Sequence, residues 1–70
     1  MTLKITVKIN GEVREIPEGL SVAALLDHLQ MAGDRVAVER NLAILPSAQW
    51  NSTPVQAGDS FEIVHLVGGG

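Results

Sequence analysis

The chain has 70 residues, no cysteine and a formal net charge of −3 at neutral pH. This length makes one small domain with one hydrophobic core, and a deep catalytic pocket needs more walls than such a domain supplies. The absence of cysteine from the sequence excludes disulfides, thiolate metal ligands and a thiol nucleophile. The negative charge argues against nucleic acid and against anionic membrane surfaces as partners.

The apolar content also limits where the protein acts. Apolar residues make up 46% of the sequence, but no apolar run is long enough to span a bilayer. The first residues lack the basic-then-apolar pattern of a signal peptide. We therefore expect a soluble cytoplasmic protein that is monomeric when free.

The first two elements form a predicted β-hairpin. Residues 3–9 alternate strictly, with Leu3, Ile5, Val7 and Ile9 on one side, which is typical of a half-buried strand. Asn10-Gly11 favours the left-handed backbone of a type I′ turn. The returning strand, Glu12 to Ile16, would place Arg14 opposite Val7, so we expect it at the edge of a sheet, ended by Pro17.

A single helix is predicted from Ser21 to Met31. Ser21 is suited to cap the first turn, and Gly33 is suited to the left-handed position after the last one. Four apolar residues at helical spacing form one stripe: Val22, Leu25, Leu26 and Leu29. One amphipathic helix covers one face of a small sheet.

The second half of the chain contains three more predicted strands. These are Val36 to Arg40, the short Ala43 to Leu45 that Pro46 stops, and Phe61 to Val67; residues 47–50 suggest one helical turn. Within the last strand, Phe61 and Ile63 share one face, whereas Glu62, Val64 and Leu66 share the other.

These elements predict an α+β domain with the β-grasp arrangement. A mixed sheet of four or five strands has one helix across one face, and the last strand lies centrally and parallel to the first. Val64 and Leu66 would then lie on the uncovered face next to the chain terminus. We interpret them as a partner-docking surface, in preference to ordinary scattered surface apolarity.

The sequence closes with Gly68, Gly69 and Gly70. Glycine loses the most conformational freedom on ordering and has no side chain to bury, so we divide the chain into a domain at 1–67 and a flexible tail at 68–70. Such a tail can thread a channel too narrow for side chains and deliver one group, the carboxylate of Gly70. The alternative is a frayed terminus or a cloning remnant.

Nothing else in the sequence suggests catalysis. His28 and His65 lack further ligands at metal spacing, and Glu39 and Asp59 are interpreted as a solvated strand residue and a turn residue. Trp50 is interpreted as a satellite core residue under a loop. We expect no metal, no bound cofactor and no catalytic residues, so the chain would be a carrier or substrate for other enzymes and not itself an enzyme.

The chain resembles the ThiS family of sulfur carriers in thiamine biosynthesis, within the ubiquitin-like β-grasp superfamily. The resemblance covers essentially the full length. It is carried by segments in family order: Ile9 to Glu12, Val22 to Leu26, Val36 to Asn41, Pro46 to Trp50, Gly58-Asp59, Glu62 to Val64 and Val67 to Gly70. Ser47 departs from the pattern, which has a basic residue after the proline.

The resemblance implies a mechanism and a set of partners. A ThiF-type enzyme using ATP and Mg would adenylate the carboxylate of Gly70, and a sulfur donor such as a cysteine desulfurase would convert it to a thiocarboxylate. Thiazole synthase (ThiG) would take the sulfur, with Gly68 and Gly69 threading the partner active sites. The alternatives are the small subunit of molybdopterin synthase, carriers for cysteine synthesis or tRNA thiolation, a lysine-linked modifier and a non-covalent β-grasp module.

Overall fold

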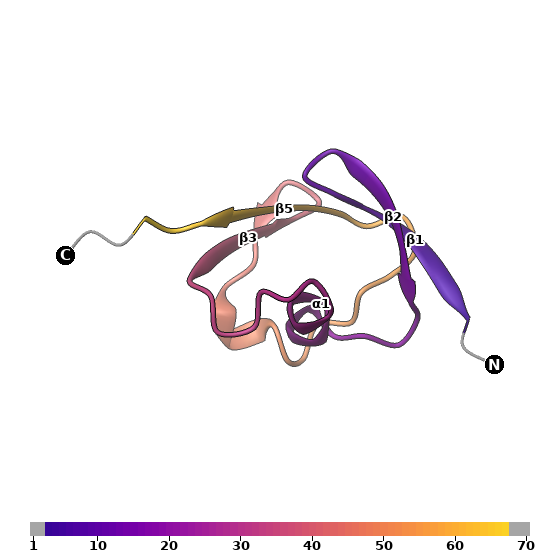
Figure 1. Ribbon diagram of the computed structural model, residues 1–70, viewed down its shortest axis with the longest axis horizontal. Coiled ribbons are helices and arrows are strands. Elements are labelled where there is room, and N and C mark those ends of the chain that lie inside the picture. Colours follow the sequence, from indigo (N-terminus) through magenta and orange to yellow (C-terminus); the bar gives the residue numbers. More distant parts are fainter. Residues whose placement is uncertain (1–2, 68–70) are drawn as a thin grey trace.

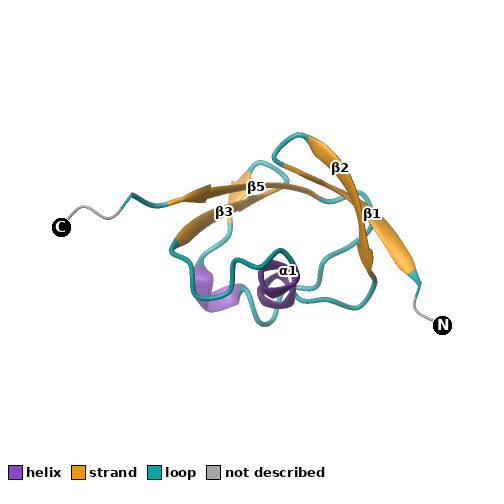
Figure 2. Ribbon diagram, viewed as in Figure 1, coloured by secondary structure: helices purple, strands orange, loops and turns teal. Residues whose placement is uncertain are grey.

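The computed structural model describes residues 3–67 and shows one mixed sheet arched over one helix (Figures 1 and 2). The sheet has five strands in the order β2-β1-β5-β3-β4. The elements in chain order are β1 (Lys4–Ile9), β2 (Glu12–Pro17), α1 (Val22–His28), β3 (Val36–Arg40), β4 (Ala43–Ile44), the 3₁₀ turn η1 (Ser47–Gln49) and β5 (Ser60–His65). The predicted β-grasp arrangement is confirmed.

β5 is the central strand of the sheet. It runs parallel to β1, where Lys8 faces Ser60, and antiparallel to β3, where Val38 faces Ile63. The parallel pairing needs a long crossover, which the chain makes through α1, β3 and β4. The strand that leads toward the chain terminus is therefore flanked on both sides at its start.

β2 is an edge strand, as predicted. Arg14 lies directly opposite Val7, on the side of the sheet that carries the core, but its side chain is half exposed and approaches Glu12 at 3.5 Å. A long charged side chain at an edge bends out to water, whereas the same residue in a central strand would bury its charge.

The core lies between the sheet and α1. Apolar residues on the covered face of the strands pack against one side of the helix, and Val55 joins them from the loop before β5. The buried residues are Val7, Ile9, Ile16, Val22, Leu25, Leu26, Val36, Val38, Val55, Phe61 and Ile63. Trp50 packs at the margin of this core, and its indole N–H donates to the carbonyl of Leu45 at 3.0 Å, as expected for a satellite residue.

The helix starts where it was predicted to start and stops earlier. The hydroxyl of Ser21 accepts from the N–H of Ala24 at 3.1 Å, which confirms the cap. The last helical residue is His28, and Gln30 takes the left-handed conformation with φ 63°. The N–H of Met31 then donates to the carbonyl of Leu26, and that of Gln30 to Asp27, which is the Schellman pattern.

The prediction of Gly33 as the helix terminator was therefore wrong. Gly33 does have a positive φ of 87°, but it lies in the following turn. Four strands also have other bounds than predicted, and β2 runs one residue further, to Pro17. Leu3 precedes β1 and is 63% exposed, β4 stops at Ile44, and β5 runs from Ser60 to His65 instead of Phe61 to Val67.

No helix within residues 3–67 is long and apolar enough to cross a bilayer. The predicted tail, Gly68 to Gly70, lies outside the described residues.

Candidate functional site

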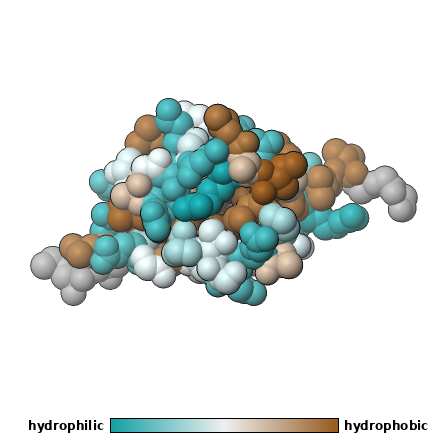
Figure 3. Space-filling model, turned by 180° about the vertical axis from the view of Figure 1, so that it is seen from behind, coloured by the Kyte–Doolittle hydropathy of each residue, from teal (hydrophilic) through white to brown (hydrophobic). Residues whose placement is uncertain are grey.

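The chain leaves the sheet through an exposed apolar segment. Val64 is 55% exposed, Leu66 48% and Val67 95%, whereas Ile63 beside them is buried. We call these three exposed residues the exit surface. Figure 3 shows hydrophobic atoms gathered at this end of the molecule, where the chain projects from the body.

Alternation along β5 explains this exposure. Phe61 and Ile63 point into the core, so Glu62 and Val64 point to the face that α1 does not cover. The N–H of Leu66 still donates to the carbonyl of Arg35 at 2.8 Å, one residue past the end of β5. Val64 and Leu66 are therefore held by the sheet and exposed to solvent, as predicted, and their docking role remains a prediction.

The uncovered face also carries two carboxylates. Glu39 and Glu62 are direct partners across β3 and β5, and Ile44 of β4 faces Glu39 from the other side. Ile44 is 77% exposed. This part of the sheet is therefore apolar and acidic, and like charges directly opposite each other stabilise nothing in the free domain.

A side-chain amide holds the middle of β5. Asn10 has φ 51°, and its carboxamide lies beside Ile63, accepting from the N–H of Ile63 at 2.7 Å and donating to its carbonyl at 3.0 Å. The N–H of Asn10 itself donates to the carbonyl of Phe61 at 2.8 Å. The amide thus continues the β1–β5 ladder after the backbone of β1 has turned away.

A buried carboxylate holds the start of β5. The side chain of Asp59 is 8% exposed and accepts from three donors: Nε of Arg40 at 3.0 Å, the N–H of Gln56 at 2.9 Å and Nδ2 of Asn41 at 3.2 Å. We call these four residues the Asp59 cluster. The amide oxygen of Asn41 accepts in turn from the N–H of Ser60 at 2.9 Å.

The cluster sets the protonation of Asp59. Burial alone would raise the pKa of this carboxyl, but the hydrogen bonds from Gln56, Asn41 and Arg40, together with the charge of Arg40, lower the pKa below its ordinary value of 3.8. Asp59 is therefore ionised at neutral pH and is a structural anchor. Asp59 also closes the turn predicted for it, since its N–H donates to the carbonyl of Gln56 at 3.0 Å, but the turn interpretation leaves out the anchoring contacts of the carboxylate.

A second contact lies at the other end of β5. Nε2 of His65 is 3.0 Å from Oδ2 of Asp34, and both side chains are about half exposed. This pair links the last residue of β5 to the loop before β3. Surface pairs of this kind contribute little to stability, typically under about 1 kcal/mol.

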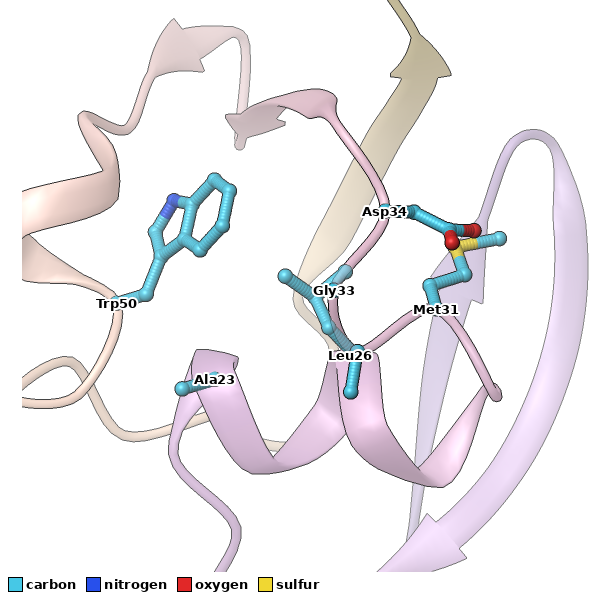
Figure 4. A pocket seen from close by; sticks show the side chains of 7 residues that line it. Ala23, Leu26, Met31, Gly33, Asp34 and Trp50 are labelled. Carbon is cyan, nitrogen blue, oxygen red and sulfur yellow. The ribbon is translucent and has the colours of Figure 1, made fainter.

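A hollow near these residues does not resemble an active site. It encloses about 200 Å³ between the end of α1 and the loop that carries Trp50, with Trp50 on one side and Leu26 and Met31 on the other (Figure 4). Small-molecule sites usually enclose about 300–1,000 Å³. The remaining lining residues are Ala23, Ala32, Gly33 and Asp34. Within residues 3–67, no group of three or more His, Asp or Glu side chains could hold a metal ion.

The structure brings together only part of the predicted site. Val64 lies in β5 and Leu66 lies one residue past its end, both exposed, while Gly68, Gly69 and Gly70 fall outside the described residues. Sequence reasoning missed the anchoring roles of Asn10 and Asp59. Asn-Gly and Gly-Asp are ordinary turn dipeptides, so neither signalled a long-range contact.

Comparison with known proteins places the chain in a family. The family model described as the ThiS family matches residues 7–70. A crystal structure of a thiamine biosynthesis protein (ThiS) from Geobacter metallireducens superposes with a TM-score of 0.82 at 32% identity, covering 94% of this chain and all of that one.

Two similar sequences differ in length. A thiazole synthase from Paramagnetospirillum magneticum is 45% identical over 62 residues, and this chain spans only 19% of that relative. The uncharacterized protein ycf40 of Porphyra purpurea is 39% identical over 66 residues, with 93% of its length covered. ThiS proteins are small sulfur carriers and not enzymes themselves. The match over residues 7–70, together with the shared fold, shows that the chain belongs to the ThiS family.

Proposed function

We propose that this domain carries sulfur for thiazole formation in thiamine biosynthesis, with the carboxylate of Gly70 as the group that is loaded. One observation carries the proposal: the match to the ThiS family extends through residue 70 and so includes all three final glycines. The exit surface and β5 support it, because this exposed surface and this central strand precede the glycines in the chain.

The chemistry requires activation of a carboxylate. A carboxylate anion is a poor electrophile, so a ThiF-type enzyme would use ATP and Mg to join AMP to an oxygen of the Gly70 carboxylate and release pyrophosphate. A persulfide sulfur on a donor such as a cysteine desulfurase would then attack the acyl carbon and expel AMP, giving an acyl disulfide. A thiol of a partner protein would attack the donor's sulfur in this disulfide, forming a disulfide with the donor and releasing the carrier's sulfur. The product is a thiocarboxylate, and no cysteine of this chain is needed.

The proposed acceptor of the sulfur is thiazole synthase. Two proteins of that name match this chain, over 62 and 64 residues, and in each the match occupies about a fifth of the relative. A carrier and its acceptor enzyme are natural neighbours within one polypeptide, since a tether raises the effective concentration of one for the other.

Each part of the carrier has a separate task in this proposal. Val64 and Leu66 dock on the partner, Gly68 and Gly69 pass through a channel that admits no side chain, and Gly70 reaches the reacting centre. Burying the exposed half of each docking side chain contributes about 1 kcal/mol per residue. Such docking is weak, which suits a carrier that must leave one enzyme for another.

Intact-mass spectrometry tests the proposal. The purified chain, with its mass first confirming Gly70 as the final residue, is incubated with the ThiF-type enzyme, Mg-ATP and a sulfur source. Replacement of one oxygen by sulfur should add about 16 Da, and a matched chain lacking Gly69 and Gly70 should not gain it. An unchanged mass in the full chain would refute the carrier role, and conjugates to lysine would indicate a modifier.

A pull-down assigns the pathway. The loaded chain should recover thiazole synthase from an extract. Recovery of the large subunit of molybdopterin synthase in its place would contradict the thiamine assignment while leaving the carrier chemistry intact.

A further inference from the structure

The backbone of β5 offers its hydrogen-bonding groups to two sides in alternation. The N–H of Asn41 donates to the carbonyl of Ser60, and the N–H of Leu66 to that of Arg35, so the even-numbered residues of β5 face β3. The odd-numbered residues face β1: Phe61 bonds the backbone of Asn10, and Ile63 bonds its side chain.

The side that faces β1 becomes an open edge after Ile63. The backbone pairing of β1 with β5 ends at Ile9 opposite Phe61, and the carboxamide of Asn10 extends it only to Ile63. His65 is the next residue on this side. Within residues 3–67, its N–H and carbonyl have no hydrogen-bond partner on that side, and Figure 1 shows β5 projecting beyond the β1–β2 hairpin.

The outer edges of the sheet carry features that discourage pairing with another strand, and this edge lacks them. β2 carries Glu12, Arg14 and Glu15 and ends in Pro17, and β4 is two residues long. The segment from Val64 to Val67 has no acidic residue, lysine, arginine or proline. Its side chains on the uncovered face, Val64 and Leu66, are apolar and half exposed.

We propose that this open edge, from Ile63 to Val67, is a strand-addition site on which an extended segment of the adenylating partner pairs with the backbone of the carrier. The partner segment lies in the plane of the sheet where β1 would have continued, and His65 exchanges main-chain hydrogen bonds with it. Val64 and Leu66 contact the same segment from the uncovered face. This inference rests on the proposed function and adds the mode of recognition.

Two features favour a partner strand over other occupants. Strand addition obtains affinity from main-chain bonds and specificity from alternate side chains, and here the alternate side chains are the exposed Val64 and Leu66. The residues that follow, Gly68 to Gly70, have no side chains, so an enzyme that aligns them has only main-chain groups to recognise.

The test removes one hydrogen-bond donor. A chemically synthesised chain carries an ester in place of the amide nitrogen of His65, which deletes that N–H and keeps the side chain. Asp34→Ala is the matched control, because it removes the contact between Asp34 and His65 and leaves every backbone N–H of β5 in place. A second ester at Leu66 deletes an N–H that is bonded to Arg35. Denaturation midpoints, size-exclusion elution and adenylation kinetics are measured for each chain.

We expect the ester at His65 to lower the denaturation midpoint only slightly, since the ester carbonyl of Val64 is a weaker acceptor toward β3. It should lower kcat/KM for adenylation about 3- to 10-fold, the effect of one lost hydrogen bond. Asp34→Ala should change kcat/KM less than twofold, and the ester at Leu66 should lower the midpoint clearly, because it deletes the bond to Arg35. A kcat/KM for the His65 ester equal to that of the unmodified chain overturns the proposal. A midpoint for that ester lowered as far as that of the Leu66 ester, or elution as a dimer, also overturns it. If the unmodified chain is not adenylated at all, the proposed function fails together with this inference.

Discussion

Replacing Asp59 with asparagine tests the polar anchor at the start of β5. One carboxylate oxygen accepts from Arg40 and Gln56, and the other accepts from Asn41. An asparagine in the same position must point its NH₂ at one of these donors. Asn41 cannot rotate its amide to compensate, because its oxygen already accepts from Ser60.

The expected cost follows from these contacts. A buried donor left without an acceptor costs about 1–3 kcal/mol, and loss of the charge weakens the remaining bonds. Arg40 keeps 27% of its side chain exposed, so water replaces part of what it loses. We expect Asp59→Asn to lower the free energy of unfolding at pH 7 by about 2–4 kcal/mol, a large share of the roughly 4–10 kcal/mol of a 70-residue domain.

The pH dependence of this loss has a definite sign. The pKa of Asp59 in the folded chain lies below 3.8, so the unfolded chain binds this proton at a higher pH than the folded chain does. The stabilisation by Asp59 is therefore fully present above about pH 4 and is lost as the pH falls through the lowered folded-state pKa. The stability gap between the wild type and Asp59→Asn should narrow in that range.

Urea denaturation followed by circular dichroism at pH 7 and in steps down to pH 2.5, about one unit below the ordinary aspartate pKa, measures the gap. Glu62→Gln is the matched control, since Glu62 is an exposed carboxylate in the same strand, and it should change the unfolding free energy by less than about 0.5 kcal/mol. A gap below about 1 kcal/mol at neutral pH would refute the anchoring argument. So would a gap that stays constant into acid.

Three further variants test the rest of the strand. Glycine tolerates the φ of 51° at position 10, so Asn10→Gly deletes both side-chain bonds to Ile63 without backbone strain. It should lower the free energy of unfolding by about 1–3 kcal/mol and speed hydrogen exchange at the Ile63 amide. Unchanged exchange there would contradict the role of the carboxamide. Leu66→Asp should weaken binding to the ThiF-type enzyme about tenfold with a normal melting curve. Val13→Asp, at a 68% exposed position on β2, is the control and should leave the affinity unchanged. Equal affinities for both variants would refute the docking role of the exit surface. Gly69→Val should abolish adenylation because the channel admits no side chain, and Val13→Ala, on β2 outside the exit surface, is the control. Undiminished adenylation of Gly69→Val would end the threading argument.

The sheet topology could be predicted from the sequence because alternating apolar residues mark the buried side of the main strands. Alternation in residues 3–9 and 61–67, with the helical stripe at Val22, Leu25 and Leu26, leaves the β-grasp as the arrangement that buries all the apolar faces together. The same logic placed Arg14 at an edge and Val64 in solvent. These outcomes depend on hydrophobic burial, and burial is the term that a sequence displays most directly.

The errors share another cause. The helix ends in a Schellman motif at Gln30, a residue that seldom adopts positive φ, while the expected Gly33 serves the next turn. Asn10 and Asp59 bond residues 53 and 19 positions away, respectively Ile63 and Arg40. Long-range polar contacts have no periodicity, so a turn dipeptide that only turns and one that also anchors a distant strand look the same in sequence.

The two halves of β5 are therefore held in place by different contacts. Its first half is fixed by the Asp59 cluster and by Asn10, so changes there act first on stability and reach the exit surface only through loosening of the strand. Its second half is fixed on one side by β3 and is open on the other, so loss of the His65 N–H or a change of the Leu66 side chain acts on partner contacts with the fold intact. We therefore expect two groups when loading rate is plotted against unfolding free energy for variants along this segment. Variants up to Ile63 should lose both together, whereas variants after Ile63 should lose loading rate at nearly constant unfolding free energy. A single correlated line through both groups would mean that the exit segment contributes only through stability, and the docking and strand-addition proposals would lose their basis.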